Sequence, residues 1–231
     1  MKYIKRFETL SGQTDYLNSA DIDTYVGYVD ENETVYYDDA LPVRYDKQYL
    51  TFVAEADNLT IGLEYAGSNV FQFSTDSGST WNNLANNQST TSVNSGETIM
   101  FKARGLTKIP YSGIGRLKPT VNTRVEGNIM SLVYGDDFAS KTSLAIDSQF
   151  DTLFSGCTGL TSAEHLILPA TTLTNNCYMS MFKGCTRLTT APSVLPATTL
   201  TNYCYASMFK GCTNLTTAPE LPATTLANEC Y

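Results

Sequence analysis

The last third of the sequence repeats itself, and this repetition limits the possible folds more than any other feature. The motif Phe-x-Gly-Cys-Thr-x-Leu starts, with periods of 28 and 27 residues, at Phe154, Phe182 and Phe209. The motif Leu-Pro-Ala-Thr-Thr-Leu starts at Leu168, Leu195 and Leu221, and Asn-x-Cys-Tyr follows each copy. One such unit cannot bury its apolar side alone, whereas stacked units can. The pattern therefore predicts a short solenoid of three units.

Each unit predicts a short extended piece, a turn bounded by proline, and a short helix. Residues 188–191 are rich in threonine, and Pro192 and Pro196 prevent a helix across the next segment. Apolar residues in 202–209 have helical spacing, and Gly211 stands where a left-handed C-terminal cap is expected. We therefore expect one short helix in each unit.

The sequence Met-Phe-Lys-Gly-Cys-Thr-x-Leu, followed by Leu-Pro-Ala-Thr-Thr-Leu, resembles the BspA-like leucine-rich repeat over roughly residues 150–231. The usual core of that repeat reads Ala-Phe-x-x-Cys-x-x-Leu, and Met181 and Met208 stand in place of the alanine. Methionine is larger, so the packing around these two positions must differ from that of the family. The resemblance implies a leucine-rich-repeat solenoid for residues 136–231.

The preceding residues, 46–135, predict a β-sandwich with a linking strand. Strand-length apolar runs, separated by clusters of Asn, Asp, Ser and Gly, lie at 49–54, 59–63, 70–73 and 97–102. A further run at 125–134 predicts one long strand, and we place the domain boundary after it, near Gly135. Several short strands in succession are typical of a sandwich. The chain as a whole is expected to be mainly β.

A turn-like string, Ser-x-Asp-x-Gly-x-Thr-Trp at residues 74–81, resembles the Asp-box hairpin of sialidases and of many non-enzymatic β proteins. A single copy predicts a folded hairpin and not an activity. Trp81 could stack on a sugar ring, because an aromatic ring offers a broad apolar face. In such a hairpin, however, a lone tryptophan more often belongs to the core.

Residues 1–45 combine acidic and tyrosine residues, and we interpret them as an arm that becomes ordered when it docks on a partner. Residues 3–8 and 127–132 resemble segments of virion proteins from phages that infect gut Bacteroidales. This looser resemblance implies that the arm binds other virion proteins, that the repeats point outward, and that the protein forms a homo-oligomer. It also implies assembly in the host cytoplasm and residence in the virion.

Charge and hydropathy argue against several classes of partner. With 23 acidic and 15 basic residues the net charge is -8, which gives little attraction to nucleic acid or anionic lipid. No long apolar run follows the basic start, so we expect no signal peptide and no membrane insertion. If the protein leaves its cell, these features favour release by lysis over secretion.

The residues with reactive side chains form no recognisable catalytic or metal-binding pattern. The cysteines form two columns, Cys157, Cys185, Cys212 and Cys177, Cys204, Cys230. An odd number in each column is a poor basis for disulfides, so we interpret them as buried thiols. His165 has no ligand-spaced companion, and the acidic pairs Asp38–Asp39 and Asp136–Asp137 are typical of solvated loops. We therefore expect no catalytic residues, no cofactor and no metal.

One set of side chains is a candidate ligand surface, namely Thr189, Thr190, Thr216 and Thr217. Stacked threonines would present hydroxyl groups to a host glycan or protein, although strand propensity alone also places them there. The preferred hypothesis is a phage virion accessory protein of the head or a tail fibre. The alternative is a bacterial cell-surface adhesin with the same repeats, which requires an export signal, and a glycan-cleaving tail enzyme ranks third. The last unit stops at Tyr231, so we expect apolar surface there that a partner or further chain covers.

Overall fold

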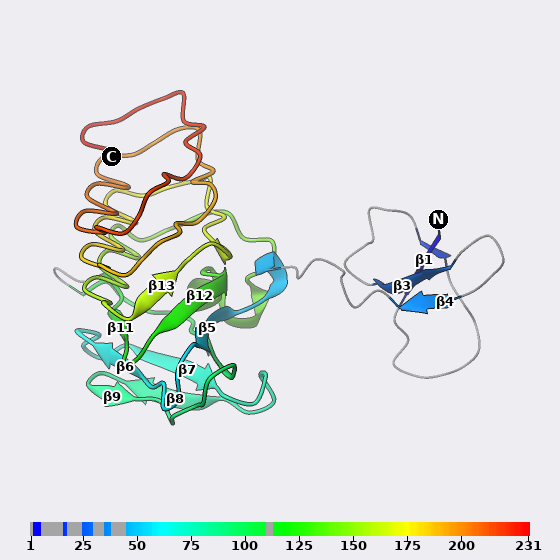
Figure 1. The fold of residues 1–231 in the computed structure, drawn as a ribbon. Coiled ribbons are helices and arrows are strands. Elements are labelled where there is room, and N and C mark those ends of the chain that lie inside the picture. The colour runs from blue at the N-terminus through cyan, green and yellow to red at the C-terminus, as the bar shows by residue number, and fades with distance from the viewer. Residues whose placement is uncertain (1, 6–15, 18–24, 30–34, 38–44, 110–112) are drawn as a thin grey trace. The chain divides into compact units, whose positions relative to one another are not determined.

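The computed structural model describes residues 2–5, 16–17, 25–29, 35–37, 45–109 and 113–231. Its contacts divide the chain into two compact units, Met1–Arg44 and Tyr45–Tyr231. The fold is mainly β with very little helix (Figure 1). In the described part the helical elements are α1 (Ser131–Tyr134) and the 3-10 turns η2 (Tyr45–Lys47) and η3 (Gly135–Asp137).

The first unit holds a four-stranded antiparallel sheet in the order β2-β1-β3-β4. Its strands are β1 (Lys2–Lys5), β2 (Tyr16–Leu17), β3 (Tyr25–Val29) and β4 (Val35–Tyr37). The tyrosines expected in strands lie in β3 and β4. The acidic residues that suggested a docking arm lie outside the described residues, namely Asp21, Asp23, Asp30, Glu31, Glu33, Asp38 and Asp39.

The second unit begins with two sheets. The larger has the order β13-β12-β5-β10-β7-β8, and β14 also pairs with β12; the smaller has the order β11-β6-β9. The strands are β5 (Leu50–Ala54), β6 (Ile61–Glu64), β7 (Val70–Ser74), β8 (Asn82–Ala85), β9 (Gln88–Ser89), β10 (Thr98–Lys102), β11 (Arg116–Pro119), β12 (Thr123–Asn128), β13 (Leu160–Ser162) and β14 (Leu166–Ile167). Buried side chains of both sheets belong to one core.

Burial follows the apolar pattern of the sequence. In β6 and β10 buried residues alternate with partly exposed ones, as one-sided strands require. Strand β5 lies between β12 and β10 and is buried at every residue. The runs predicted at 49–54, 59–63, 70–73 and 97–102 are confirmed as β5, β6, β7 and β10.

The long strand predicted for 125–134 is wrong in its second half. Strand β12 ends at Asn128, whose side-chain oxygen accepts a hydrogen bond from the Met130 N–H at 2.9 Å, and α1 follows. The Ser131 hydroxyl accepts from the Leu50 N–H and donates to the Phe101 carbonyl. The side chains of Asn128 and Ser131 thus end the strand within an apolar stretch by bonding to backbone groups. Strand propensity alone does not predict such an end.

Gly127 is required where β12 meets the repeats. Its φ is +84°, and a Cβ at this position would lie 2.1 Å from the Tyr49 carbonyl oxygen. The Gly127 N–H also donates to the carbonyl of His165 at 3.0 Å. Strands β13 and β14 pair in parallel with β12, so the sheet continues into the repeats across the boundary predicted near Gly135.

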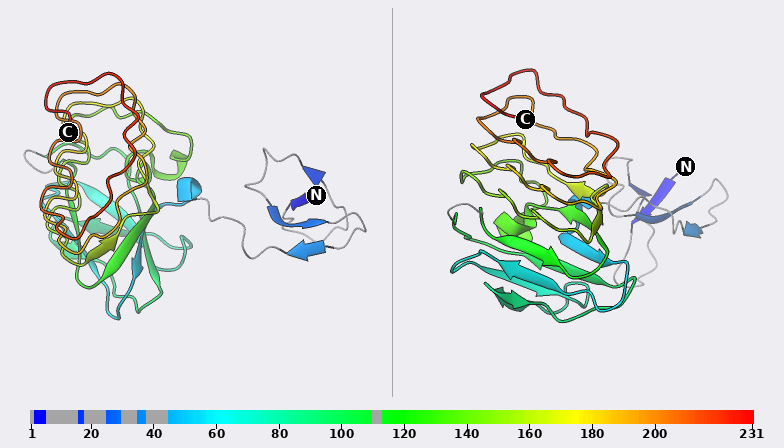
Figure 2. Two further views of the ribbon diagram at one scale, coloured as in Figure 1. Left: turned by 45° about the horizontal axis from the view of Figure 1, so that its top comes forward. Right: turned by 60° about the vertical axis from the view of Figure 1, so that its left-hand side comes forward.

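Beyond the sheets the chain winds into stacked coils, residues 148–175, 176–202 and 203–228 (Figures 1 and 2). Backbone N–H groups of each coil donate to carbonyls of the next, as Phe150 does to Cys177 at 2.7 Å and Tyr178 to Cys204 at 2.8 Å. Strictly repeated positions thus lie over one another. Equivalent side chains accordingly form columns along the stack.

The helix predicted in each repeat is wrong. Along each coil, some backbone N–H groups donate to a carbonyl of the next coil, as Phe154 does to Met181. Those in between donate to the carbonyl three residues back in the same coil, as Leu153 does to Phe150. Every fourth residue is left-handed, with φ between 53° and 80°: Ser148, Thr152, Gly156; Asn176, Ser180, Gly184; Tyr203, Ser207, Gly211. A turn that repeats every four residues buries i and i+4 much as a helix does, so over nine residues the two patterns look alike.

Aromatic columns run through the core without interruption. One joins the sheet to all three coils, with ring centroids 5.4 to 5.9 Å apart: Phe101, Phe52, Phe154, Phe182 and Phe209. The other runs along the coils at 5.5 to 6.0 Å: Phe150, Tyr178, Tyr205 and Tyr231. Sheets and coils therefore share one hydrophobic core.

Candidate functional site

The predicted threonine surface is divided by the structure. Thr189 is exposed, but its hydroxyl donates to the Thr161 carbonyl at 3.0 Å, and the Thr190 hydroxyl lies 2.5 Å from that of Ser162. Thr216 and Thr217 are exposed on the last coil. The first two threonines thus hold neighbouring coils together, which reduces what they can offer a ligand. A ligand role for the four stays a prediction.

A second set of threonines is more regular. The Thr-Thr pairs of the Leu-Pro-Ala-Thr-Thr-Leu motif are exposed in all three coils: Thr171, Thr172; Thr198, Thr199; Thr224, Thr225. Thr199 and Thr225 form a parallel bridge, so the pairs lie in register. Sequence reasoning found this motif but did not propose its threonines as a surface. The signal was available, because a polar pair repeated in register must lie on the outside of the stack.

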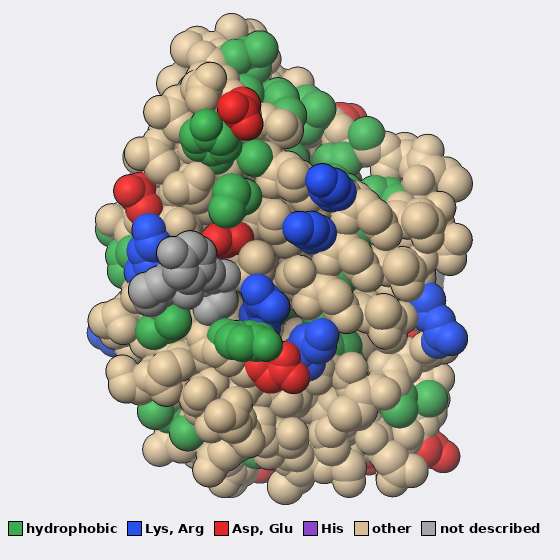
Figure 3. Space-filling model, turned by 90° about the vertical axis from the view of Figure 1, so that its left-hand side faces the viewer, with side chains coloured by type: hydrophobic (Ala, Val, Ile, Leu, Met, Phe, Trp, Pro, Cys, Tyr) green, Lys and Arg blue, Asp and Glu red, His purple; other side chains and the backbone are tan. Residues whose placement is uncertain are grey.

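A group of cations lies on another side of the stack. We call Arg116, Lys118, Lys183 and Lys210 the basic face. Figure 3 looks onto this side and shows Lys and Arg side chains gathered in its middle. β11 lies under the first coil, since the Leu117 N–H donates to the Leu153 carbonyl at 2.8 Å. Arg116 and Lys118 flank Leu117 and reach up to Thr152 and Gly156 of that coil.

The cysteines are buried, as predicted. Each thiol of the first column donates to a carbonyl of the layer beneath it: Cys157 to Leu117, Cys185 to Phe154 and Cys212 to Phe182, at 3.0 to 3.1 Å. Burial raises the pKa of Cys177 in the second column to about 12. The thiols of the first column act as hydrogen-bond donors, and cysteine suits the position because it is small and carries that donor.

His165 is a packing residue. Its ring stacks on Tyr45 with centroids 4.3 Å apart and planes 3° apart, and its carbonyl anchors Gly127. The ring and the backbone of His165 thus both serve contacts between the repeats and the preceding part of the chain.

Asp136 and Asp137 line an open groove of about 690 Å³ with Arg104 and Lys141. Asp136 accepts from Lys102 and from the Tyr49 hydroxyl, both at 2.7 Å, and these bonds lower the pKa of its carboxyl group. Asp137 is paired with Arg104. Both carboxylates are thus neutralised by cations, whereas the pair Asp38–Asp39 lies outside the described residues.

The hairpin predicted at 74–81 is confirmed, since β7 and β8 pair antiparallel from Val70 to Phe73. Asp76 organises the turn: its carboxylate accepts from the N–H and hydroxyl of Thr80 and from the Ser74 hydroxyl, which lowers its pKa to about 2. Trp81 is half-buried, 5.0 Å from the Tyr49 ring, with the Lys102 amine 4.2 Å above it. The tryptophan therefore has the Lys102 amine over one face of its ring and Tyr49 in an edge contact.

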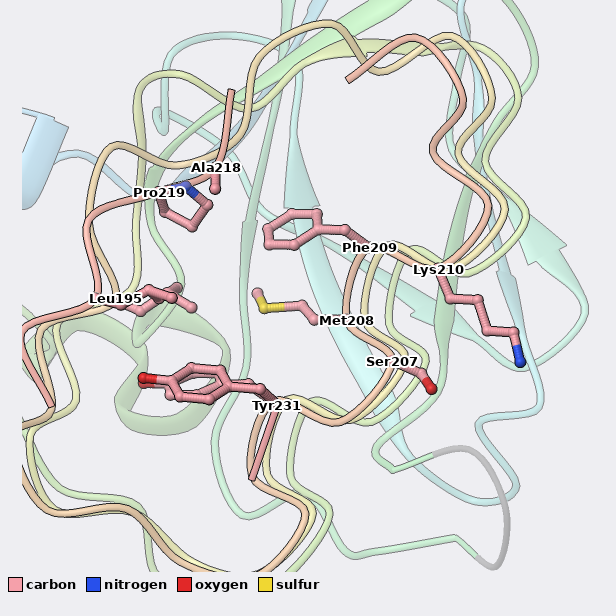
Figure 4. Close-up of a pocket in the computed structure, with 10 residues that line it drawn as sticks. Leu195, Ser207, Met208, Phe209, Lys210, Ala218, Pro219 and Tyr231 are labelled. Carbon is pink, nitrogen blue, oxygen red and sulfur yellow. The ribbon is translucent and has the colours of Figure 1, made fainter. Parts of the chain in front are cut away.

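The last coil ends in an apolar hollow of about 420 Å³, shown in Figure 4. Met208, Phe209 and Tyr231 point into it, and Leu195 closes the opposite side. The N–H groups of Ser207, Phe209 and Gly211 have no acceptor among the described residues, whereas the equivalent groups one coil earlier donate to the third coil. This end of the stack offers both apolar surface and backbone donors.

In the described ranges no group of His, Cys, Asp and Glu side chains could hold a metal ion, and no helix is long and apolar enough to cross a membrane. No known protein family, no curated protein and no solved structure matches this chain.

Proposed function

We propose that this chain is a non-enzymatic attachment protein, in which a β-sandwich carries a three-unit BspA-like leucine-rich-repeat solenoid that displays a binding surface. The observation that carries the proposal is the in-register stacking of the coils. It repeats the same exposed side chains at intervals of roughly 5 Å, close to the spacing of neighbouring strands. Such a surface suits a repetitive ligand, because each coil can make the same contact.

The preferred setting is a phage virion, as an accessory protein of the head or of a tail fibre. The resemblance of residues 3–8 and 127–132 to Bacteroidales phage virion proteins supports it. In this setting the N-terminal unit binds other virion proteins, the coils bind a host surface glycan or protein, and the protein is a homo-oligomer. The compact unit Met1–Arg44, separate from the rest by its contacts, is consistent with a distinct attachment role.

The alternative setting is the bacterial cell surface, where the same coils would serve an adhesin. The regular outward threonine pairs suit either setting, since both need a surface that contacts glycans or proteins from outside. Only the location of the protein separates the two.

Electron microscopy of purified phage particles, labelled with an antibody against residues 150–231, tests the location. Label on the capsid or tail supports the virion proposal and shows which structure carries the protein. Bare particles together with labelled bacterial cells would favour the adhesin, and absence of label from both would overturn the proposal. Release of sugars from host polysaccharide by the purified full chain would overturn its non-enzymatic part.

A further inference from the structure

The basic face is one continuous row along the stack. The Gly156, Gly184 and Gly211 positions lie over one another, because a Cβ at Gly184 would meet the Gly156 Cα at 3.8 Å and one at Gly211 the Gly184 Cα at 3.6 Å. Lys183 and Lys210 directly precede two of these glycines. Below them the Lys118 amine donates to the Gly156 carbonyl at 3.2 Å. The row thus leads from β11, past Gly156 of the first coil, where Ser155 replaces the lysine, to the second and third coils.

The two upper cations of this face, Lys183 and Lys210, have no acidic partner in the part of the chain that the structure describes, whereas Arg116 at its lower end has acidic neighbours. Among the described residues no ion pair involves any member of the basic face. Two acids lie near its lower end: Glu64 is opposite Arg116 in the β6–β11 pairing, and Asp151 is a buried residue of the first coil. Lys183 and Lys210 are exposed, with no acidic residue in either of their repeats before Glu220.

The local charge runs against that of the chain. The whole protein has a net charge of -8, yet between residues 166 and 219 the charged residues are Lys183, Arg187 and Lys210. Arg187 lies just beyond the glycine column and bonds the Asn122 side chain. A positive strip on an acidic protein attracts anions locally, while the overall charge repels dense polyanions.

Hydroxyl groups border the cations. Thr152, Ser180 and Ser207 occupy equivalent places on one side of the row, and Thr158, Thr186 and Thr213 on the other. Four of these six side chains are exposed, namely Thr158, Thr186, Ser207 and Thr213. At the lower end the Tyr65 ring, 58% exposed, lies 4.7 Å from the Arg116 guanidinium. Cations, hydroxyls and an exposed aromatic ring are the groups that recognise carboxylated sugars.

We propose that the basic face binds an acidic polysaccharide along the stack axis, with carboxylates on Lys183 and Lys210 and sugar hydroxyls on the bordering Ser and Thr residues. The inference rests on the proposed attachment function and names its ligand class. A polysaccharide fits better than nucleic acid for two reasons. Its charges are sparser, so the net charge of -8 opposes it less. The row also offers only one cation in each of the second and third coils, and no run of stacked aromatic rings.

The test measures binding of the full chain to hyaluronan at low salt by affinity electrophoresis, next to carboxyl-reduced hyaluronan and single-stranded DNA. Retardation by hyaluronan alone is the expected result. Lys183→Gln and Lys210→Gln should each weaken binding about threefold and together about tenfold, with a loss of salt dependence. Lys141→Gln, a partly exposed lysine in the loop beside the groove of Asp136, should leave binding unchanged.

Three results would overturn the inference: equal binding of the carboxyl-reduced polymer, preference for DNA, or wild-type affinity in the double variant. The test is separable from that of the attachment function. The full-length protein could be found on virions and adhere to host cells, yet bind neither hyaluronan nor alginate nor polygalacturonate. This result would refute the ligand class and leave the attachment function standing. Absence from virions and cells would refute the attachment function itself.

Discussion

Tyr178 buries a phenol oxygen that has no hydrogen-bond partner. Its ring stacks on Phe150 and Tyr205 at 5.5 Å, so the ring contributes to the core while the hydroxyl group only loses its hydration. An unpaired buried hydroxyl costs roughly 1–3 kcal/mol. We expect Tyr178→Phe to keep or raise the free energy of unfolding, by up to about 1 kcal/mol, in urea denaturation. A clear loss of stability would show that the hydroxyl group has a partner in solution.

Asp151 gives the stability of the protein a dependence on pH. Burial raises the pKa of its carboxyl group from 3.8 to about 6, and nearby Arg116 and Lys108 offset part of that rise. The folded state therefore holds the proton more tightly than the unfolded chain. The protonated carboxyl group of Asp151 therefore contributes fully to the free energy of unfolding below about pH 4. This contribution is lost as the pH rises to about 6 and does not return above it.

Asp151→Asn removes this ionisation. The difference in unfolding free energy between the variant and the parent should grow in favour of the variant from pH 4 to pH 6 and then level off, at on the order of 2 kcal/mol. Thermal or urea unfolding of both proteins at several pH values measures the difference. A constant difference across this range would contradict the assignment.

At the scale of the element, the last coil should open first. The Phe154 and Phe182 N–H groups donate to the next coil at 3.0 and 2.9 Å, whereas that of Phe209 has no acceptor among the described residues. In hydrogen exchange of dilute protein we expect the Phe209 amide to exchange at least about a hundredfold faster than the Phe182 amide. Equal protection at Phe209 would mean that another segment or molecule covers this end.

The elements show why some predictions succeeded and others failed. The strands β5, β6, β7 and β10 were predictable because their alternation or continuous burial needs only local sequence. The coils were not, because a four-residue turn period imitates a helix over so short a segment. Gly211 was rightly expected to be left-handed, with a φ of +80°, but it shares that conformation with Ser180 and Ser207, which no propensity would place there.

At the scale of the whole molecule, residues 45–231 should unfold in one transition although the sequence suggested two domains. Phe154 contacts Phe52 of the sheet and Phe182 of the second coil, with centroids 5.9 and 5.4 Å apart. Phe154→Ala should cost about 3–5 kcal/mol. It should shift the fluorescence transition of Trp81 and the circular-dichroism transition by the same amount, whereas two separate shifts would show that the sheets and the coils fold independently.

The basic face could not be predicted, because its members come from β11 and from two separate coils. Lys183 and Lys210 repeat in the sequence, but only the seating of β11 beneath the first coil brings Arg116 and Lys118 into the same row. The threonine pairs, by contrast, were accessible from the motif alone. Contacts between repeats can be inferred from their register, and contacts between a repeat and its support require the structure.

Each coil packs on the coil beneath it through nearly the same surface that it offers to the coil above, and this affects how repeat number can change in evolution. Every coil presents to its successor nearly the same carbonyls, aromatic rings and thiol donors that it received. A recombination event that inserts or deletes one repeat therefore rebuilds an interface that already exists and leaves the supporting sheets unchanged. For the proposed attachment function, the length of the stack and the number of equivalent contacts would then change with repeat number alone, without any compensating substitution in the core.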